Sequence, residues 1–203
     1  MQLITWNIQW GRGADGRVDL QRIAADARRL AGNGGGDGDA DVLCLQEVSC
    51  GYPELGGCDG SDQFAALAAL WPRHTAIAGI AGIATDTPAP GGGRRGFGNM
   101  ILSRYPVRQV LRHLLPWPAD GISSMQRIAL EATLDTPLGL LRVTTTHLEY
   151  YSATQRGAQV QRLRELQREG AAHARATRKG AAAAGPFESF ARGGPSILCG
   201  DFN

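Results

Sequence analysis

The sequence lacks a long hydrophobic run and a strong excess of charge of either sign. No positively charged start followed by an apolar run precedes the first strand-like segment, and no apolar stretch is long enough to span a bilayer. The 21 basic and 19 acidic residues give a net charge of +2, far from the basic excess of proteins that live on nucleic acid. We therefore expect a soluble, cytoplasmic protein in which any phosphate-binding surface is local.

Cysteine is also scarce, and the spacing of the four cysteines does not match a zinc site. Cys44 and Cys199 lie inside apolar runs, where we expect free, buried thiols. Cys50 and Cys58 flank a glycine-rich loop, and a disulfide between them remains an open alternative.

The length of the chain and its apolar content indicate one domain. With 203 residues, of which 43% are hydrophobic, the chain can cover a sizeable sheet. We expect a single domain over residues 1–203 and a monomer.

The beginning of the chain has the order strand, helix, strand. Leu3 to Trp10 alternates in the manner of a half-buried strand, with Asn7 on its polar face. Apolar residues then recur at helical spacing from Leu20 to Ala31, before a glycine-rich stop. Asp41 to Glu47 is a short apolar run, typical of a buried strand, that ends in a carboxylate.

The rest of the chain predicts two more helices and several consecutive strands. Ser61 can cap a helix that ends near Trp71, and Ser152 with Gln155 forms a capping box before a long helix that the Ala-rich tract to Ala184 can prolong or fray. We interpret Ile77 to Gly96, which has no period, as a surface loop. The predicted strands are Asn99–Ser103, Val107–Leu114, Arg127–Leu134, Leu140–His147 and Ser196–Asp201. This mixture favours a mixed α/β arrangement of sheets covered by helices.

Polar residues stand at the ends of several of these strands. They are Asn7, Glu47, His147, Asp201 and Asn203. Mg²⁺ prefers oxygen ligands, usually one or two carboxylates together with waters and phosphate oxygens. An imidazole beside them can donate to a phosphate oxygen as charge builds up. Singly, each residue has a plainer explanation in turn chemistry, a surface position or a hydrogen-bonded core, and only the combination indicates a site.

Five short motifs resemble, in order, those of the endonuclease/exonuclease/phosphatase superfamily. They are Thr5-Trp-Asn7, Leu45-Gln-Glu47, Gly98-Asn99-Met-Ile-Leu-Ser-Arg104, Thr146-His147-Leu148 and Gly200-Asp201-Phe-Asn203. The superfamily includes deoxyribonucleases, abasic-site endonucleases, sphingomyelinases and inositol polyphosphate phosphatases. The resemblance implies a four-layer α/β/β/α sandwich of two mixed sheets with helices outside.

The resemblance also implies roles for the motif residues. Asn7 and Glu47 would hold a divalent metal, Mg²⁺ or Mn²⁺, with Glu47 as the principal ligand. His147 would contact the scissile phosphate, and Asp201 would orient or deprotonate the attacking water. In addition, Asn203 would hold a phosphate oxygen or the metal, and Asn99 would help position this network.

The segment after the fourth motif is similar to the tyrosyl-DNA phosphodiesterase branch of the superfamily. It continues through Glu149 to Arg156 and Gln159 on a predicted helix. Packing or a helix-surface position is the competing explanation for Arg156 and Gln159.

The end of the chain departs from the superfamily pattern. Members continue past the Gly-Asp-Phe-Asn motif to a further Asp and to a Ser-Asp-His segment that supplies a catalytic base. We therefore expect this chain to be C-terminally truncated, to lack the last strands of the sandwich and to be inactive as it stands.

The expected function is metal-dependent hydrolysis of phosphodiester bonds, most simply in nucleic acid. The alternatives are a catalytically silent module that binds phosphate or a partner, and hydrolysis of phospholipid or inositol phosphate. The loops from Gly51 to Gly60 and from Ile83 to Phe97, which we expect to flank the cleft, carry few aromatic residues for stacking bases. The sequence does not distinguish endonuclease from exonuclease action.

Overall fold

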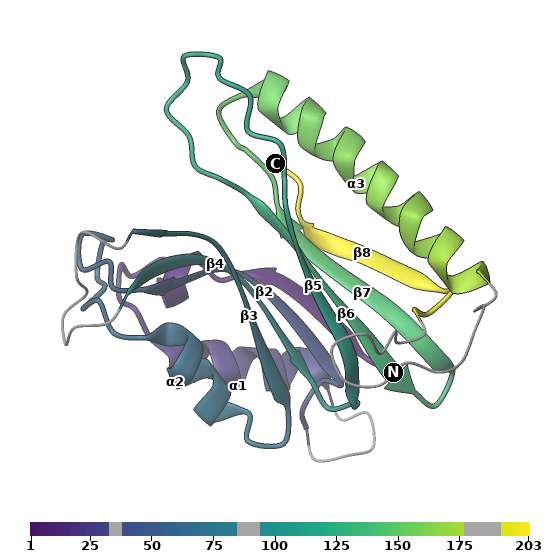
Figure 1. Cartoon of the computed structure of the whole chain (residues 1–203). Coiled ribbons are helices and arrows are strands. Elements are labelled where there is room, and N and C mark those ends of the chain that lie inside the picture. The colour runs from purple at the N-terminus through teal and green to yellow at the C-terminus, as the bar shows by residue number, and fades with distance from the viewer. Residues whose placement is uncertain (33–37, 85–93, 177–191) are drawn as a thin grey trace.

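Two four-stranded mixed sheets pack face to face in the computed structural model, which describes residues 1–32, 38–84, 94–176 and 192–203 (Figure 1). The first sheet has the order β1 (Leu3–Asn7), β2 (Val42–Cys50), β4 (Arg95–Ser103) and β3 (Thr75–Ala84). The second has the order β5 (Val107–Leu114), β6 (Ile128–Thr136), β7 (Gly139–His147) and β8 (Ser196–Asp201).

Helices cover the outer face of each sheet. On the first sheet lie α1 (Leu20–Ala31) and α2 (Gln63–Leu70), and α3 (Ala153–Arg175) lies along the second (Figure 1). Ile23 of α1 and Leu67 of α2 share a buried cluster with Leu45 of β2, whereas Leu163 of α3 packs with Ala129 of β6. The predicted α/β fold with two mixed sheets is therefore confirmed.

The core between the sheets consists of apolar side chains from both. Val42, Cys44 and Ile101 of the first sheet meet Leu130 and Val143 of the second, and all five are fully buried. This contact fixes the position of one sheet on the other, so that the strand ends of the two sheets share one edge.

Both sheets contain a parallel pair, and these pairs set the register of the predicted site residues. In β1 and β2, Asn7 lies opposite Gln46. In β7 and β8, His147 lies opposite Asp201. Because parallel strands end on the same side of a sheet, the polar groups of each pair lie together.

The prediction of a surface loop over Ile77–Gly96 was wrong at both ends. Residues up to Ala84 form β3, β4 begins at Arg95, and only residues 85–93 lie outside the described part. The glycines and alanines of β3 give no hydrophobic period, yet they allow close packing. A Cβ atom on Gly98 would lie 2.1 Å from the carbonyl oxygen of Gly79.

Two strand boundaries near the site also differ from prediction. The first strand ends at Asn7 and not at Trp10, because a 3₁₀ turn follows at Gln9–Gly11. The second strand does not end at Glu47 but continues to Cys50.

The start of α2 also differs. It is capped by Asp62 and not by Ser61, since the carboxylate of Asp62 accepts from Ala65 N at 3.1 Å. The capping of α3 by Ser152 is as predicted, with Gln155 N donating to its hydroxyl at 3.0 Å. The predicted extension of this helix to Ala184 lies outside the described residues.

The structure bears on the expectations about the cysteines and about membrane-spanning segments. All four cysteines, including Cys50 and Cys58, are free thiols. Within the described ranges, no helix is both long and apolar enough to cross a membrane.

Candidate active site

Four of the predicted site residues meet at the shared edge of the two sheets. Asn7 ends β1, Glu47 lies in β2, His147 ends β7 and Asp201 ends β8. The amide Nδ2 of Asn7 donates to Glu47 Oε1 at 3.0 Å and to Asp201 Oδ2 at 2.9 Å. His147 lies between the same carboxylates, with Nδ1 3.7 Å from Glu47 Oε1 and Nε2 3.8 Å from Asp201 Oδ2. Residues 194 positions apart in the chain are thus in direct contact.

The backbone around this cluster adopts conformations that L-residues seldom take. Among the described residues, the non-glycine positions with positive φ are Gln9, Trp10, Glu47 and Asn203. Each lies within three residues of Asn7, Glu47 or Asp201. Glu47, with φ of 58°, sits in a β-bulge where the pairing of β2 with β4 shifts between Leu45 and Val48. Such bulges and strained residues gather at functional sites, where they aim a side chain.

A buried glutamine connects the two sheets beneath the cluster. Gln46 Nε2 donates to Thr145 Oγ1 of β7 at 2.9 Å and to the carbonyl of Cys44 at 2.9 Å. The sequence placed Gln46 in an apolar run but did not assign it a role. Its polarity at a position that must be buried was the available signal.

Burial and nearby charge set the protonation states at the cluster. Burial, followed by the positive charge of Arg127, lowers the pKa of His147 to about 4, so its imidazole is neutral at pH 7. Burial alone would raise the pKa of Asp201. Hydrogen bonds from Asn7 and the Asn203 backbone, together with His147 and Arg127, more than offset this and lower it.

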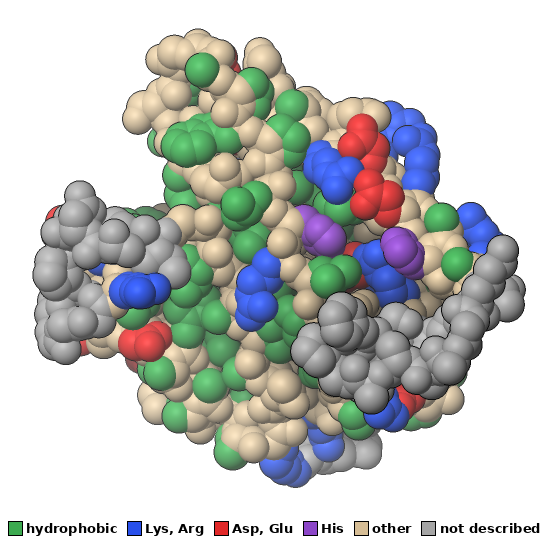
Figure 2. All heavy atoms as spheres, viewed as in Figure 1, with side chains coloured by type: hydrophobic (Ala, Val, Ile, Leu, Met, Phe, Trp, Pro, Cys, Tyr) green, Lys and Arg blue, Asp and Glu red, His purple; other side chains and the backbone are tan. Residues whose placement is uncertain are grey.

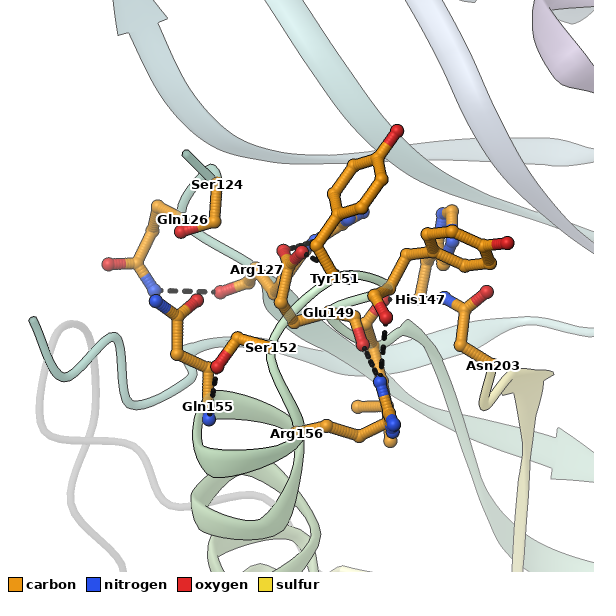
Figure 3. Close-up of polar contacts among 12 residues, drawn as sticks. Ser124, Gln126, Arg127, His147, Glu149, Tyr151, Ser152, Gln155, Arg156 and Asn203 are labelled. Atoms are coloured by element: carbon orange, nitrogen blue, oxygen red, sulfur yellow. Dashed lines mark hydrogen bonds and ion pairs between the residues drawn. The ribbon is translucent and has the colours of Figure 1, made fainter. Parts of the chain in front are cut away.

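Two further residues border the cluster: Arg127, to which no role was assigned from sequence, and Glu149, which the sequence placed only in the segment after the fourth motif. Arg127 lines a pocket together with Glu47, Asn99 and His147. Its Nε is 3.2 Å from Oε2 of Glu149, whose side chain is almost completely buried (Figure 3). The pairing itself leaves no sequence signal, because the two residues are 22 positions apart and belong to different predicted segments.

The two remaining predicted residues are held by the backbone near the cluster. Asn203 Nδ2 donates to the carbonyl of Leu148 at 2.8 Å, and its backbone N–H donates to Asp201 Oδ1 at 3.1 Å. Asn99 is buried, and its amide donates to the carbonyl of Ile128 at 3.1 Å. Asn99 therefore lines the pocket, whereas the Asn203 amide braces the end of β7.

Arg156 and Gln159 of α3 form hydrogen bonds with the backbone of the turn after β7. Gln159 is fully buried and accepts from the backbone N–H of Glu149 at 2.9 Å. Arg156 Nη1 donates to the carbonyls of Glu149 and Tyr150, each at 2.8 Å.

The donor set fits a magnesium-type ion bound by few protein ligands. In the described part of the chain, no group of three or more His, Cys, Asp or Glu side chains is arranged as a metal cage. Mg²⁺, however, commonly uses one or two carboxylates and completes its shell with waters and phosphate oxygens. Glu47 and Asp201 supply two such carboxylates, with side chains 17% and 29% exposed. Asn7 Oδ1 accepts from Gln9 N at 3.0 Å and retains a second lone pair.

Charged groups are mixed over the visible face of the molecule. Figure 2 shows basic and acidic side chains interspersed, without one large field of either sign.

A family model and several solved structures match this chain. The model described as "Endonuclease/Exonuclease/phosphatase family" matches residues 4–203. No curated protein matches the sequence. An endonuclease/exonuclease/phosphatase from Beutenbergia cavernae is 28% identical with a TM-score of 0.62, covering 81% of this chain and 43% of its own.

Two structures from Bacteroides thetaiotaomicron are similar in fold alone. One is an endonuclease/exonuclease/phosphatase family protein, 16% identical with a TM-score of 0.62, matched over 100% of this chain and 63% of its own. The other is a mannosyl-6-phosphatase, 15% identical with a TM-score of 0.57, matched over 100% and 65%. The chain thus spans between 43% and 65% of the length of these three structures.

Proposed function

Because the chain belongs to the endonuclease/exonuclease/phosphatase family, whose members are hydrolases, we propose that it is a divalent-metal-dependent phosphodiesterase acting on nucleic acid. The observation that carries this proposal is the meeting of Asn7, Glu47, His147 and Asp201 from four strands of two sheets. The stability of the fold does not require such a cluster, because burying polar groups costs free energy unless each one is hydrogen-bonded or paired with an opposite charge.

In this proposal Glu47 is the principal ligand of Mg²⁺ or Mn²⁺, and Asn7 Oδ1 is a second, neutral ligand. When bound, the ion supplies positive charge that stabilises a phosphate as negative charge develops on it. Glu47 carries most of the affinity because its carboxylate supplies negative charge that the neutral amide of Asn7 cannot.

The other residues act on the proton and on the phosphate. Neutral His147 donates a ring N–H to a phosphate oxygen, and its low pKa keeps it from competing as a cation with the metal. Asp201, ionised at neutral pH, accepts a hydrogen bond from water and orients it for attack. Asn203 steadies this edge, and Asn99 shapes the pocket wall.

Nucleic acid is the proposed substrate because the site combines a phosphate-directed imidazole with a neighbouring guanidinium. Arg127 lies in the same pocket as His147 and Glu47. The low net charge suits a substrate held at a few points and does not require a long basic surface.

The test is a hydrolysis assay on the full-length protein with Mg²⁺ or Mn²⁺. Substrates are bis(p-nitrophenyl) phosphate, single-stranded DNA, duplex DNA, RNA and phosphatidylcholine. Glu47→Gln should abolish metal-dependent turnover, whereas Glu165→Gln, on the exposed side of α3, should not change it. Phosphate binding without turnover of any substrate would instead favour the silent module.

A further inference from the structure

Two exposed tyrosines follow the strand that carries His147, and the proposed chemistry does not use them. Tyr150 is 63% exposed and Tyr151 is 73% exposed. Their rings meet edge to face, with centroids 4.9 Å apart and an interplanar angle of 89°. Two adjacent exposed rings form a contiguous apolar surface, and such surfaces can mark interaction sites.

Buried polar groups hold the backbone that presents these rings. The fully buried Glu149 accepts from Tyr151 N at 3.0 Å, while its own N–H donates to Gln159. Arg156 donates to the carbonyl of Tyr150 at 2.8 Å (Figure 3). Side chains of Glu149, just after β7, and of Arg156 and Gln159 in α3 therefore hold the backbone of this turn. The two exposed rings contribute little to the core.

The ends of β7 and β8 are tied together, because Leu148 N donates to the carbonyl of Asp201 at 2.9 Å and Asn203 Nδ2 donates back to Leu148. The turn that carries Tyr150 and Tyr151 thus begins beside the strand ends that carry His147 and Asp201.

We propose that Tyr150 and Tyr151 form a stacking platform for a nucleobase adjacent to the scissile phosphodiester. This inference rests on the proposed function and names a contact that decides its substrate. Stacking on aromatic rings accepts every base, because each base has a π-face, and it needs no large basic surface. A rigid turn also binds with little loss of conformational entropy. A membrane-inserting tip is the less suitable assignment, since the backbone of this turn is anchored by buried polar groups and both of its rings carry hydroxyls.

The experiment measures binding of fluorescein-labelled single-stranded oligonucleotides by anisotropy, with Ca²⁺ replacing Mg²⁺. One oligonucleotide carries eight thymines, and the other has the same backbone without bases. Tyr150→Leu and Tyr151→Leu should each weaken binding of the thymine oligonucleotide about 10-fold, within the range for loss of one stacked base. Tyr150→Phe and Tyr151→Phe should retain binding, and the abasic oligonucleotide should bind all variants equally. Thermal unfolding of each variant verifies that the exposed substitutions leave the fold intact.

Other outcomes would overturn the platform in distinguishable ways. Equal binding of both oligonucleotides by wild type, or equal loss in the Leu and Phe variants, would refute stacking while leaving hydrolysis to the Glu47→Gln assay. Binding to phosphatidylcholine vesicles that the Leu variants lose would reassign the rings to a lipid surface. Absence of binding to either oligonucleotide would overturn both the platform and nucleic acid as the substrate.

Discussion

At the scale of single residues, the side chain of Asn7 makes the candidate site possible. Its amide separates two carboxylates and donates to both, which offsets the repulsion between them. The same hydrogen bond favours the ionised form of Asp201 and so contributes to its lowered pKa.

We predict that Asn7→Ala raises the pKa of Asp201. The substitution removes a hydrogen bond that favours the ionised form of Asp201. It also leaves the negative charge of Glu47 to act on Asp201 without the Asn7 amide between them. Carboxyl ¹³C NMR titration of the metal-free chain measures this directly, with Asp15, whose carboxylate pairs with Arg22, as an internal reference. An unchanged titration of Asp201 would show that the hydrogen bond does not set its protonation.

His147→Ala should lower kcat about 10²-fold or more in the full-length protein and change KM little. A donor aimed at developing phosphate charge is felt mainly in the transition state. His173→Ala, near the end of α3, is the matched control. Near-normal kcat with a raised KM would mean that His147 binds substrate and does not stabilise its transition state.

The motif residues could be named from sequence because they stand together at strand ends and their motifs follow the order of the superfamily. The ion pair between Arg127 and Glu149 could not be predicted, since a contact between distant positions depends on how β6 and the turn after β7 are placed in space. The exposed tyrosines were overlooked for a related reason. Their position beside the cluster becomes visible only when β7 and β8 are seen to be paired.

At the scale of elements, the start of α2 offers a direct test. Asp62→Ala should lower the free energy of unfolding by about 0.5–2 kcal/mol, the usual cost of losing an N-cap. Ser61→Ala should leave it nearly unchanged, because Asp62 is the residue that accepts from Ala65 N. Urea denaturation of the two variants distinguishes them, and a larger effect at Ser61 would restore the original prediction.

Helices with strong periods were predictable, whereas strands built from small residues were not. The limits of α1 follow from its apolar spacing and glycine stop and agree with prediction. For β3, by contrast, the glycines and alanines carry no pattern, and only their close packing on β4 identifies the strand. The bulge that places Glu47 inside β2 is likewise a property of pairing with β4.

At the scale of the whole molecule, one apolar core joins the two sheets, and we propose that they form a single domain. Leu130→Ala should therefore destabilise the protein by about 2–5 kcal/mol, since Leu130 is fully buried among residues of both sheets. Leu138→Ala, 84% exposed, is the control. Calorimetry should record one cooperative transition that shifts as a whole, and two separate transitions would contradict a shared core.

The central claim is that the edge shared by the two sheets binds a divalent cation through Glu47, and calorimetric titration of Mn²⁺ into the chain tests it most directly. Wild type and Glu165→Gln should bind with the same affinity, and Glu47→Gln should bind at least about 10-fold more weakly, because a neutral amide cannot replace the charge of a carboxylate. Equal affinity of Glu47→Gln and wild type would remove Glu47 from the site and contradict the account.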